Sequence, residues 1–226
     1  MLTLVIANKL YSSWSLRPWL MMTELGLAFD EIVIPLDQPD TATRILAHSP
    51  AGKVPILLDG PLRVWDTLAI LEYLAELHPG RVWPADRAAR ALARSISAEM
   101  HAGFGALRSA CPMNLGKRFA RRDRGPAVAR DLARVEAIWR DARARFGSGG
   151  PFLFGAFSGA DAMYVPVVTR LDTYDLPVAP DTRAYMDAVL NLPGFQAWRE
   201  AALKETWIVP HDEVDEEPLV DHRAGR

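Results

Sequence analysis

The residues that could do chemistry in this chain are concentrated between positions 52 and 67. A Val54–Pro55 bond precedes a short apolar run, an Asp59–Gly60 turn leads into a second run, and Asp66–Thr67 opens a helical pattern. Asp-Gly is a strong hairpin signal, and the free backbone amides at a helix start favour an anion. This stretch therefore indicates a small cleft that binds a charged, peptide-like ligand.

A second polar cluster lies where the first apolar run meets the first helical pattern. It contains serines at positions 12, 13 and 15, directly after Tyr11. Serine is common at helix N-caps, so local sequence alone favours a capping role for these serines, and Ser15 suits a cap better than a catalyst. A hydroxyl in this position could also hydrogen-bond an anion beside the helix N-terminus. Tyr11 is an alternative hydroxyl donor.

The composition excludes several classes of protein. The 226 residues carry a net charge of −2, which argues against wholesale binding of nucleic acid or of membrane surfaces. Cys111 is the only cysteine, so an intramolecular disulfide and a Cys-rich zinc site are impossible, and we expect it to be buried. The five histidines show no ligand spacing, so we expect no metal site.

The N-terminal run Leu2–Ala7 is apolar but has no basic leader or cleavage site. We therefore expect a buried strand there, not a signal peptide, and a cytoplasmic protein. No apolar run approaches the roughly 20 residues that span a bilayer, so we expect no membrane segment.

Hydrophobic periodicity divides the chain into two parts. Strands are expected over residues 2–7, 29–34, 56–58 and 62–65, and helices over 15–26, 40–47 and 66–77. This order predicts a βαβ unit with parallel strands, followed by a hairpin, in a small sheet with helices on both faces. After a linker over residues 78–86, only helices are expected: residues 87–109, 127–146, 158–172, 181–191 and 194–205.

This arrangement resembles the cytosolic glutathione S-transferases over nearly the whole chain. Residues 11–17 resemble the serine-type active-site segment, closest to the zeta-class pattern, and residues 52–55 with Asp66–Thr67 resemble the glutathione-binding motif. Phe157–Ala162 matches the family's capping box, which we assign to folding through Ser158 and Asp161. The resemblance implies a thioredoxin-like α/β domain over 1–80 and an all-α domain over 87–212. The polar composition of the last residues predicts a flexible tail over 213–226.

Two departures from the family pattern affect function. Trp14 stands where zeta enzymes have a cysteine, which argues against maleylacetoacetate-type isomerase activity. Asp66–Thr67 replaces the usual Glu-Ser or Gln-Ser pair, but it keeps a carboxylate and a hydroxyl. Residues 99–104 and 112–114 resemble a bacterial branch whose substrates we do not name.

The resemblance also implies the site. Glutathione reacts as a thiolate, yet a free thiol has a pKa of about 8.5, so a hydroxyl must stabilise the anion. We expect Ser12 to be this catalytic hydroxyl, with Ser13 second. A cis Val54–Pro55 bond would present the backbone of Val54 to the peptide, while Asp66 takes the ammonium and Thr67 a carboxylate. The expected glutathione contacts are Ser12, Ser13, Trp14, Lys53, Val54, Pro55, Asp66 and Thr67.

The second substrate would be a small hydrophobic electrophile held against the helix that begins at Arg87. His101, Phe104 and Arg108 are the expected pocket residues, with core packing as the alternative for Phe104. The implied protein is a cytoplasmic, homodimeric detoxification enzyme that uses glutathione as co-substrate. Three alternatives stay open: a glutathione-dependent isomerase, a peroxidase and a non-catalytic binding protein. A thiol oxidoreductase is disfavoured because the first domain has no cysteine.

Overall fold

The first half of the molecule is built on a four-stranded sheet in the order β2-β1-β3-β4. In the computed structural model, which describes residues 1–223, the strands are β1 (Leu2–Ile6), β2 (Phe29–Val33), β3 (Ile56–Asp59) and β4 (Leu62–Trp65). β1 pairs parallel with β2 and antiparallel with β3, which forms a hairpin with β4. The predicted thioredoxin-like unit is confirmed.

Helices cover both faces of this sheet. Successive side chains of β1 point to opposite faces, and apolar side chains on both faces need to be covered. Leu4 and Ile6 pack towards α1 (Ser13–Glu24) and α3 (Thr67–Leu77) in the main core. Val5 faces the other way and packs with Ile45 of α2 (Thr41–Leu46).

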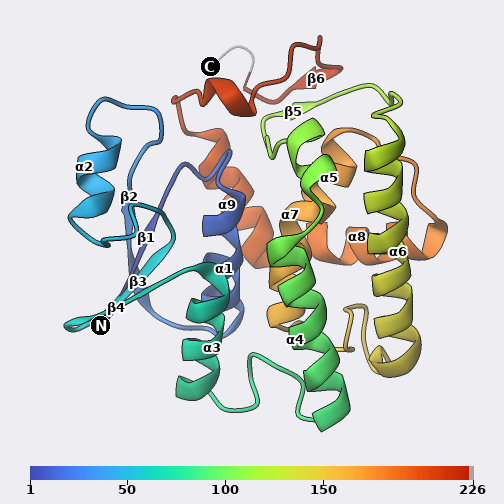
Figure 1. Cartoon of the computed structure of the whole chain (residues 1–226), viewed down its shortest axis with the longest axis horizontal. Helices are drawn as coiled ribbons and strands as arrows, with labels where there is room; N and C mark the ends of the chain where they lie inside the picture. The colour runs from blue at the N-terminus through green and yellow to red at the C-terminus, as the bar shows by residue number, and fades with distance from the viewer. Residues whose placement is uncertain (224–226) are drawn as a thin grey trace.

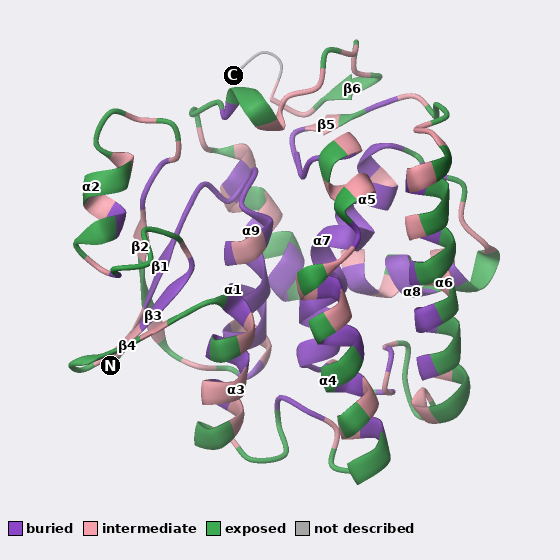
Figure 2. Cartoon of the chain, in the orientation of Figure 1, coloured by how far each residue is buried: buried purple, intermediate pink, exposed green. Residues whose placement is uncertain are grey.

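The second half is helical and lies beside the sheet domain (Figure 1). Its helices are α4 (Arg87–Ala102), α5 (Gly105–Ala110), α6 (Pro126–Phe146), α7 (Gly159–Thr173), α8 (Pro180–Leu190) and α9 (Pro193–Leu203). Every residue of α7 except Asp172 is buried, and Figure 2 shows this helix at the centre of the bundle. Within residues 1–223, no helix combines the length and the apolarity that a membrane crossing needs.

The single helix predicted over 87–109 is wrong, because it is interrupted between α4 and α5. The Gly103 amide closes α4 on Glu99 O, where a Cβ at position 103 would lie only 2.8 Å from that oxygen. Phe104 then adopts a left-handed conformation with φ 57°, which a continuous right-handed helix does not allow. This turn separates α5 from α4.

The capping box predicted at α7 is confirmed. The buried Asp161 carboxylate accepts the Ser158 amide at 2.9 Å and the Ser158 hydroxyl at 2.8 Å. It also accepts the Leu153 amide at 3.0 Å and the Tyr185 hydroxyl at 3.1 Å. One carboxylate therefore starts α7 and joins it to the preceding loop and to α8.

The flexible tail predicted over 213–226 is not what residues 213–223 show; residues 224–226 lie outside the described part of the chain. After the short helix η1 (Pro210–Asp212), β6 (Val220–Asp221) pairs with β5 (Lys117–Arg118). These two-residue strands also differ from the prediction of helices alone after residue 86. Figure 1 shows the segment crossing the top of both halves.

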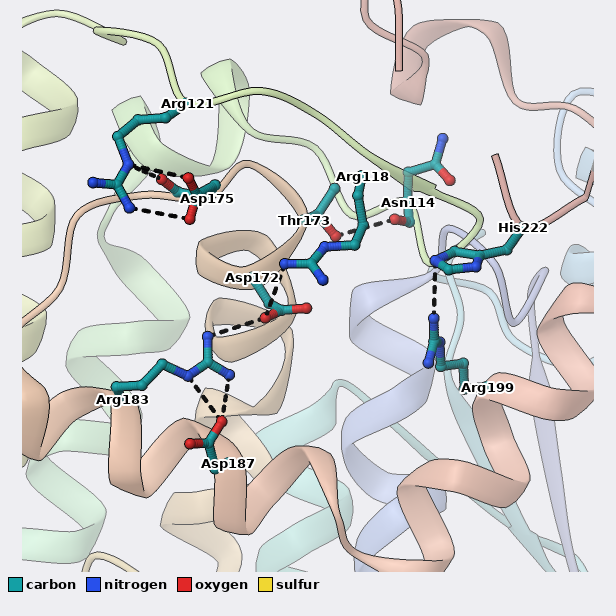
Figure 3. Close-up of polar contacts among 10 residues, drawn as sticks. All are labelled: Asn114, Arg118, Arg121, Asp172, Thr173, Asp175, Arg183, Asp187, Arg199 and His222. Carbon is teal, nitrogen blue, oxygen red and sulfur yellow. Dashed lines mark hydrogen bonds and ion pairs between the residues drawn. The ribbon is translucent and has the colours of Figure 1, made fainter. Parts of the chain in front are cut away.

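Ion pairs explain why this polar segment packs. Glu216 pairs with Arg124, and the Nη2–Oε2 distance is 2.9 Å. Figure 3 shows His222 facing Arg199 of α9, and the distance from Nε2 to Nη2 is 3.1 Å. In the same view Asp172 lies between Arg183 and Arg118, which pairs with the segment at Val220. Charges that suggested a solvated tail in the sequence therefore meet opposite charges or hydrogen-bond partners on distant elements.

Glu213 gives a direct test of this packing, because its carboxylate joins both halves. It accepts the Tyr11 hydroxyl at 2.6 Å, the Asn114 amide at 3.1 Å and the Lys117 ammonium at 2.7 Å. We expect Glu213→Ala to lower the free energy of unfolding by about 1–3 kcal/mol, since it leaves the buried Tyr11 hydroxyl without this acceptor. Glu217→Ala, at an exposed residue of the same segment, is the matched control in a urea titration. Equal effects of the two substitutions would contradict the packed segment.

Candidate active site

Two adjoining cavities lie between the halves of the molecule, and they share Trp14 and Arg108. The first has a volume of about 310 Å³. It is lined by Trp14, Ala51, Lys53, Val54, Pro55, Trp65, Asp66, Thr67, His101 and Arg108. Six of the eight predicted glutathione contacts are in this lining, brought together from three separate segments.

The loop that enters β3 and the start of α3 form one side of the first cavity. The Val54–Pro55 peptide bond is cis, as expected. Val54 is half-buried at the cavity wall, whereas Lys53 is exposed beside it. Trp65, at the end of β4, lines the same cavity with 45% of its surface exposed, and the sequence analysis missed it.

Asp66 connects the two halves at this cavity. It caps α3 by accepting the Leu68 amide at 2.8 Å, and its other oxygen lies 2.6 Å from His101 Nε2 on α4. Its φ of 75° is unusual for a residue other than glycine. The side chain is 43% exposed, so the carboxylate remains accessible to a ligand.

Thr67 is placed differently from the prediction. It is buried, and its hydroxyl donates to the Trp14 carbonyl at 3.1 Å. The hydroxyl therefore ties α3 to α1 and its proton does not point to a ligand. The free amides of the α3 N-terminus are the remaining donors at this end of the cavity.

Of the three serines at the start of α1, Ser12 is the N-cap, whereas Ser13 and Ser15 lie in the first turn of the helix. The Ser12 hydroxyl accepts the Ser15 amide at 3.4 Å and donates to Ser15 Oγ at 2.8 Å. Ser15 Oγ in turn accepts the Ala7 amide at 3.1 Å. The Ser13 hydroxyl has no hydrogen-bond partner within residues 1–223, and Ser13 lines the second cavity together with Ser12. Ser13 is thus the serine with an uncommitted hydroxyl.

The helical half holds the loop that carries these serines. The Trp198 indole of α9 donates to the Lys9 carbonyl at 2.9 Å. Glu205, just beyond α9, accepts the amides of Lys9 and Leu10 at 2.7 and 3.0 Å. Residues nearly 200 positions apart therefore set where α1 begins.

The second cavity, of about 490 Å³, has a mostly polar lining. The residues are Tyr11, Ser12, Ser13, Trp14, Leu36, Gly105, Arg108, Ser109, Arg170, His211 and Asp212. Tyr11 donates its hydroxyl to Glu213, and burial raises the pKa of Tyr11 above its usual value. Its proton is therefore committed, which argues against Tyr11 as a donor to a ligand.

The structure separates the three predicted second-substrate residues. Arg108 lines both cavities, and His101 lines only the first, where it meets Asp66. Phe104 lines neither, since it is 6% exposed and packs in the core. Sequence analysis missed Arg170 of α7, although an arginine within an otherwise apolar, buried helix was a usable signal.

Trp14 lies against two guanidinium groups at the junction of the cavities. The guanidinium carbons of Arg17 and Arg108 lie 4.2 Å and 5.0 Å from its ring centroid. Arg17 is 1% exposed and makes no ion pair with any described residue; burial lowers its pKa well below the usual range. In residues 1–223 there is no group of three or more His, Cys, Asp or Glu arranged to hold a metal.

Two family models match the chain. The model for the glutathione S-transferase N-terminal domain matches residues 11–77, and that for the C-terminal domain matches residues 125–201. Together they span well over half of the chain. No curated protein matches it significantly.

Solved structures show the same fold at low identity. A glutathione transferase homologue from Burkholderia, with bound glutathione, is 22% identical with a TM-score of 0.68, over 89% of this chain and 97% of that one. The theta-class glutathione S-transferase of Xanthomonas axonopodis, also with glutathione bound, is 23% identical with a TM-score of 0.62. The match covers 87% of this chain and 95% of that one. A diazinon-metabolizing glutathione S-transferase from the silkworm Bombyx mori is 16% identical with a TM-score of 0.69, over 89% and 97%.

Cys111 is a nucleophile that the site does not present to a ligand. It is fully buried, as expected, and burial raises the pKa of its thiol to about 11. We expect the folded protein not to react with Ellman's reagent at about pH 8, because the thiolate is the reactive form. In guanidinium chloride the same sample should release one thiol per chain. Rapid labelling of the folded protein would contradict the buried position.

Proposed function

The chain belongs to the glutathione S-transferase family, and we propose that it is an active transferase that binds glutathione in the first cavity and adds its sulfur to an electrophile in the second. One observation carries the proposal. Trp14, the 53–55 loop and Asp66–Thr67 line one cavity, and that cavity opens onto another at Trp14 and Arg108. The glutathione-bound relatives from Burkholderia and Xanthomonas support the choice of ligand.

The chemistry of the first cavity supports a particular orientation of glutathione. The Val54 backbone would pair with the cysteinyl backbone, as an added strand pairs with a sheet edge. The γ-glutamyl ammonium would meet Asp66, and its carboxylate would lie on the amides that start α3. Lys53 is exposed at the cavity wall and would meet the glycyl carboxylate. Asp66 would then exchange its contact with His101 for one with the ligand.

We assign the thiolate to Ser13, the second choice of the sequence analysis. The sulfur would lie where the cavities meet, beside the first turn of α1. Ser13 has a free hydroxyl there, while the Ser12 hydroxyl is committed to Ser15. A two-unit fall in the thiol pKa corresponds to about 2.7 kcal/mol. One charge-assisted hydrogen bond contributes about 1.5–3 kcal/mol, and the Arg108 charge and the helix N-terminus favour the anion further.

The reaction would be attack of this thiolate on the electrophilic carbon. A sulfur–carbon bond forms, and the leaving group departs with its electron pair. Holding both reactants in adjoining cavities supplies proximity, and the lowered thiol pKa supplies the nucleophile. The homodimer, the cytoplasmic location and the role in detoxification stay proposals that rest on the family.

The serine assignment predicts different pKa values for bound glutathione in two variants. We expect the ultraviolet absorbance of the thiolate to titrate at least about one pH unit higher in Ser13→Ala than in the wild type. Ser12→Ala is the matched control, which should lose about 1 kcal/mol of stability as a missing N-cap but keep the thiolate. The reverse pattern would return the role to Ser12. No glutathione binding at millimolar concentration would refute the transferase, and binding without thiolate would indicate a binding protein.

The orientation of glutathione predicts a role for the Asp66 charge. We expect Asp66→Asn to weaken glutathione binding about 10- to 100-fold in calorimetry, because the ammonium loses its carboxylate partner. Asp86→Asn is the matched control: Asp86 also caps a helix, accepting the Ala89 amide at 2.8 Å, but does not line the cavity. Equal affinities in the two variants would contradict the orientation.

A further inference from the structure

Arg170 is a buried cation for which the proposed function gives no role. It lies on α7, is 5% exposed and lines the second cavity. Its Nη1 donates to the Pro166 carbonyl at 3.1 Å, but its Nε has no hydrogen-bond partner among residues 1–223. No carboxylate of residues 1–223 lies within ion-pair distance of it. Burial lowers its pKa to about 10, so it remains charged at neutral pH.

The surroundings of Arg170 add to its charge. Arg108 lines the same cavity, and it too forms no ion pair in the described part of the chain. Arg108 is close enough to disfavour the charge on Arg170: after burial, its charge is the largest cause that lowers the pKa of Arg170. Two unpaired guanidinium groups at one cavity are an unfavourable arrangement unless an anion joins them.

Asp212 is the opposing charge in this cavity. It attracts Arg170 electrostatically but lies beyond ion-pair distance, and its nearest basic contact is His211 at 3.8 Å. Two arginines and one aspartate line the cavity, and the buried Arg17 lies close enough to both arginines for their charges to lower its pKa. Positive charge therefore exceeds negative charge here, which favours an anionic ligand.

We propose that the second cavity takes an electrophile that carries a carboxylate, bound by Arg170 and Arg108. The inference rests on the proposed function and replaces the expected hydrophobic electrophile by an anionic one. Arg108 lies at the junction of the cavities, so the carboxylate holds the reacting carbon near the glutathione sulfur. Guanidinium groups suit this task because their N–H donors match the geometry of a carboxylate.

The test compares two probes that differ in this one charge: a chloronitrobenzoate and the chloronitrobenzamide with the same ring substitution. Binding is measured by calorimetry, without glutathione and with S-methylglutathione, which cannot react. We expect the wild type to bind the benzoate at least about tenfold more tightly than the benzamide. Equal affinities, or no measurable binding of the benzoate, would overturn the inference.

Substitutions then test whether Arg170 and Arg108 are the residues that bind the carboxylate. Arg170→Met and Arg108→Met should each bring the two affinities within about twofold of one another. Arg199→Met removes a positive charge outside both cavities and should keep the preference. Arg108 is only partly buried, so its variant gives an answer even where Arg170→Met does not fold by circular dichroism. A preference unchanged in every folded cavity variant would overturn the assignment.

Measurements of turnover distinguish a failure of the carboxylate site from a failure of the proposed transferase activity. With glutathione, the thiolate displaces chloride from the ring: the sulfur–carbon bond forms and chloride leaves with the electron pair of the carbon–chlorine bond. Rates are divided by the uncatalysed rate of each probe, because the two rings differ in reactivity. Turnover of both probes without a preference for the benzoate contradicts the carboxylate site alone. Failure of glutathione to bind contradicts the transferase, while the probe affinities still test the site.

Discussion

The buried guanidinium of Arg17 is the constraint from which the arrangement of the two cavities follows. Arg17 is on α1 and donates its Nε to the Met163 carbonyl of α7 at 2.9 Å, and its Nη1 to the Ser13 carbonyl at 2.8 Å. A charge held away from water is unfavourable by several kcal/mol unless hydrogen bonds and nearby charges offset it. The bond to Ser13 lies within α1, whereas the bond to Met163 can be kept only while α1 stays against α7. It therefore helps to fix the sheet domain relative to the helical domain.

The position of α1 in turn determines the site. Trp14 lies against Arg17, its carbonyl receives the Thr67 hydroxyl, and its ring lies 5.1 Å from that of His101. The first turn of α1 is therefore joined to α3 and to α4 through one residue. Any ligand that reaches from the first cavity to the second must pass Trp14 and Arg108, where positive charge is concentrated. In the proposed function, a thiolate at this place would be stabilised by these charges and by the helix N-terminus as well as by the Ser13 hydroxyl.

The parts of this structure that were predictable depend on neighbours in sequence. The Asp59–Gly60 turn, the Ser158–Asp161 box and the strand periods were sufficient for the sheet and for most helices. The predictions that were wrong concern features that depend on contacts between residues distant in sequence. Ser15 does not cap α1, because its Oγ accepts the Ala7 amide just after β1, and the tail packs because Glu213 contacts Tyr11 and Lys117. Gly103 and Gly105 were a local signal for the turn at Phe104. The apolar spacing on either side nevertheless favoured one helix, and phenylalanine itself rarely adopts a positive φ.

The two cavities also differ in how far apart in sequence their residues lie. The first is built from residues 14–67 and from two residues of the α4–α5 region, so motifs within one domain could identify six of its members. The second draws Ser13 from α1, Arg108 from α5, Arg170 from α7 and Asp212 from η1, four elements spread over 200 positions. No local motif can encode such a set. Relatives that share 16–23% of residues keep the fold, with TM-scores of 0.62–0.69, and therefore keep the frame that brings these four elements together. The fold does not dictate which side chains these elements carry. In our proposal Arg108 and Arg170 therefore select an anionic electrophile, while the residues of the first cavity bind glutathione.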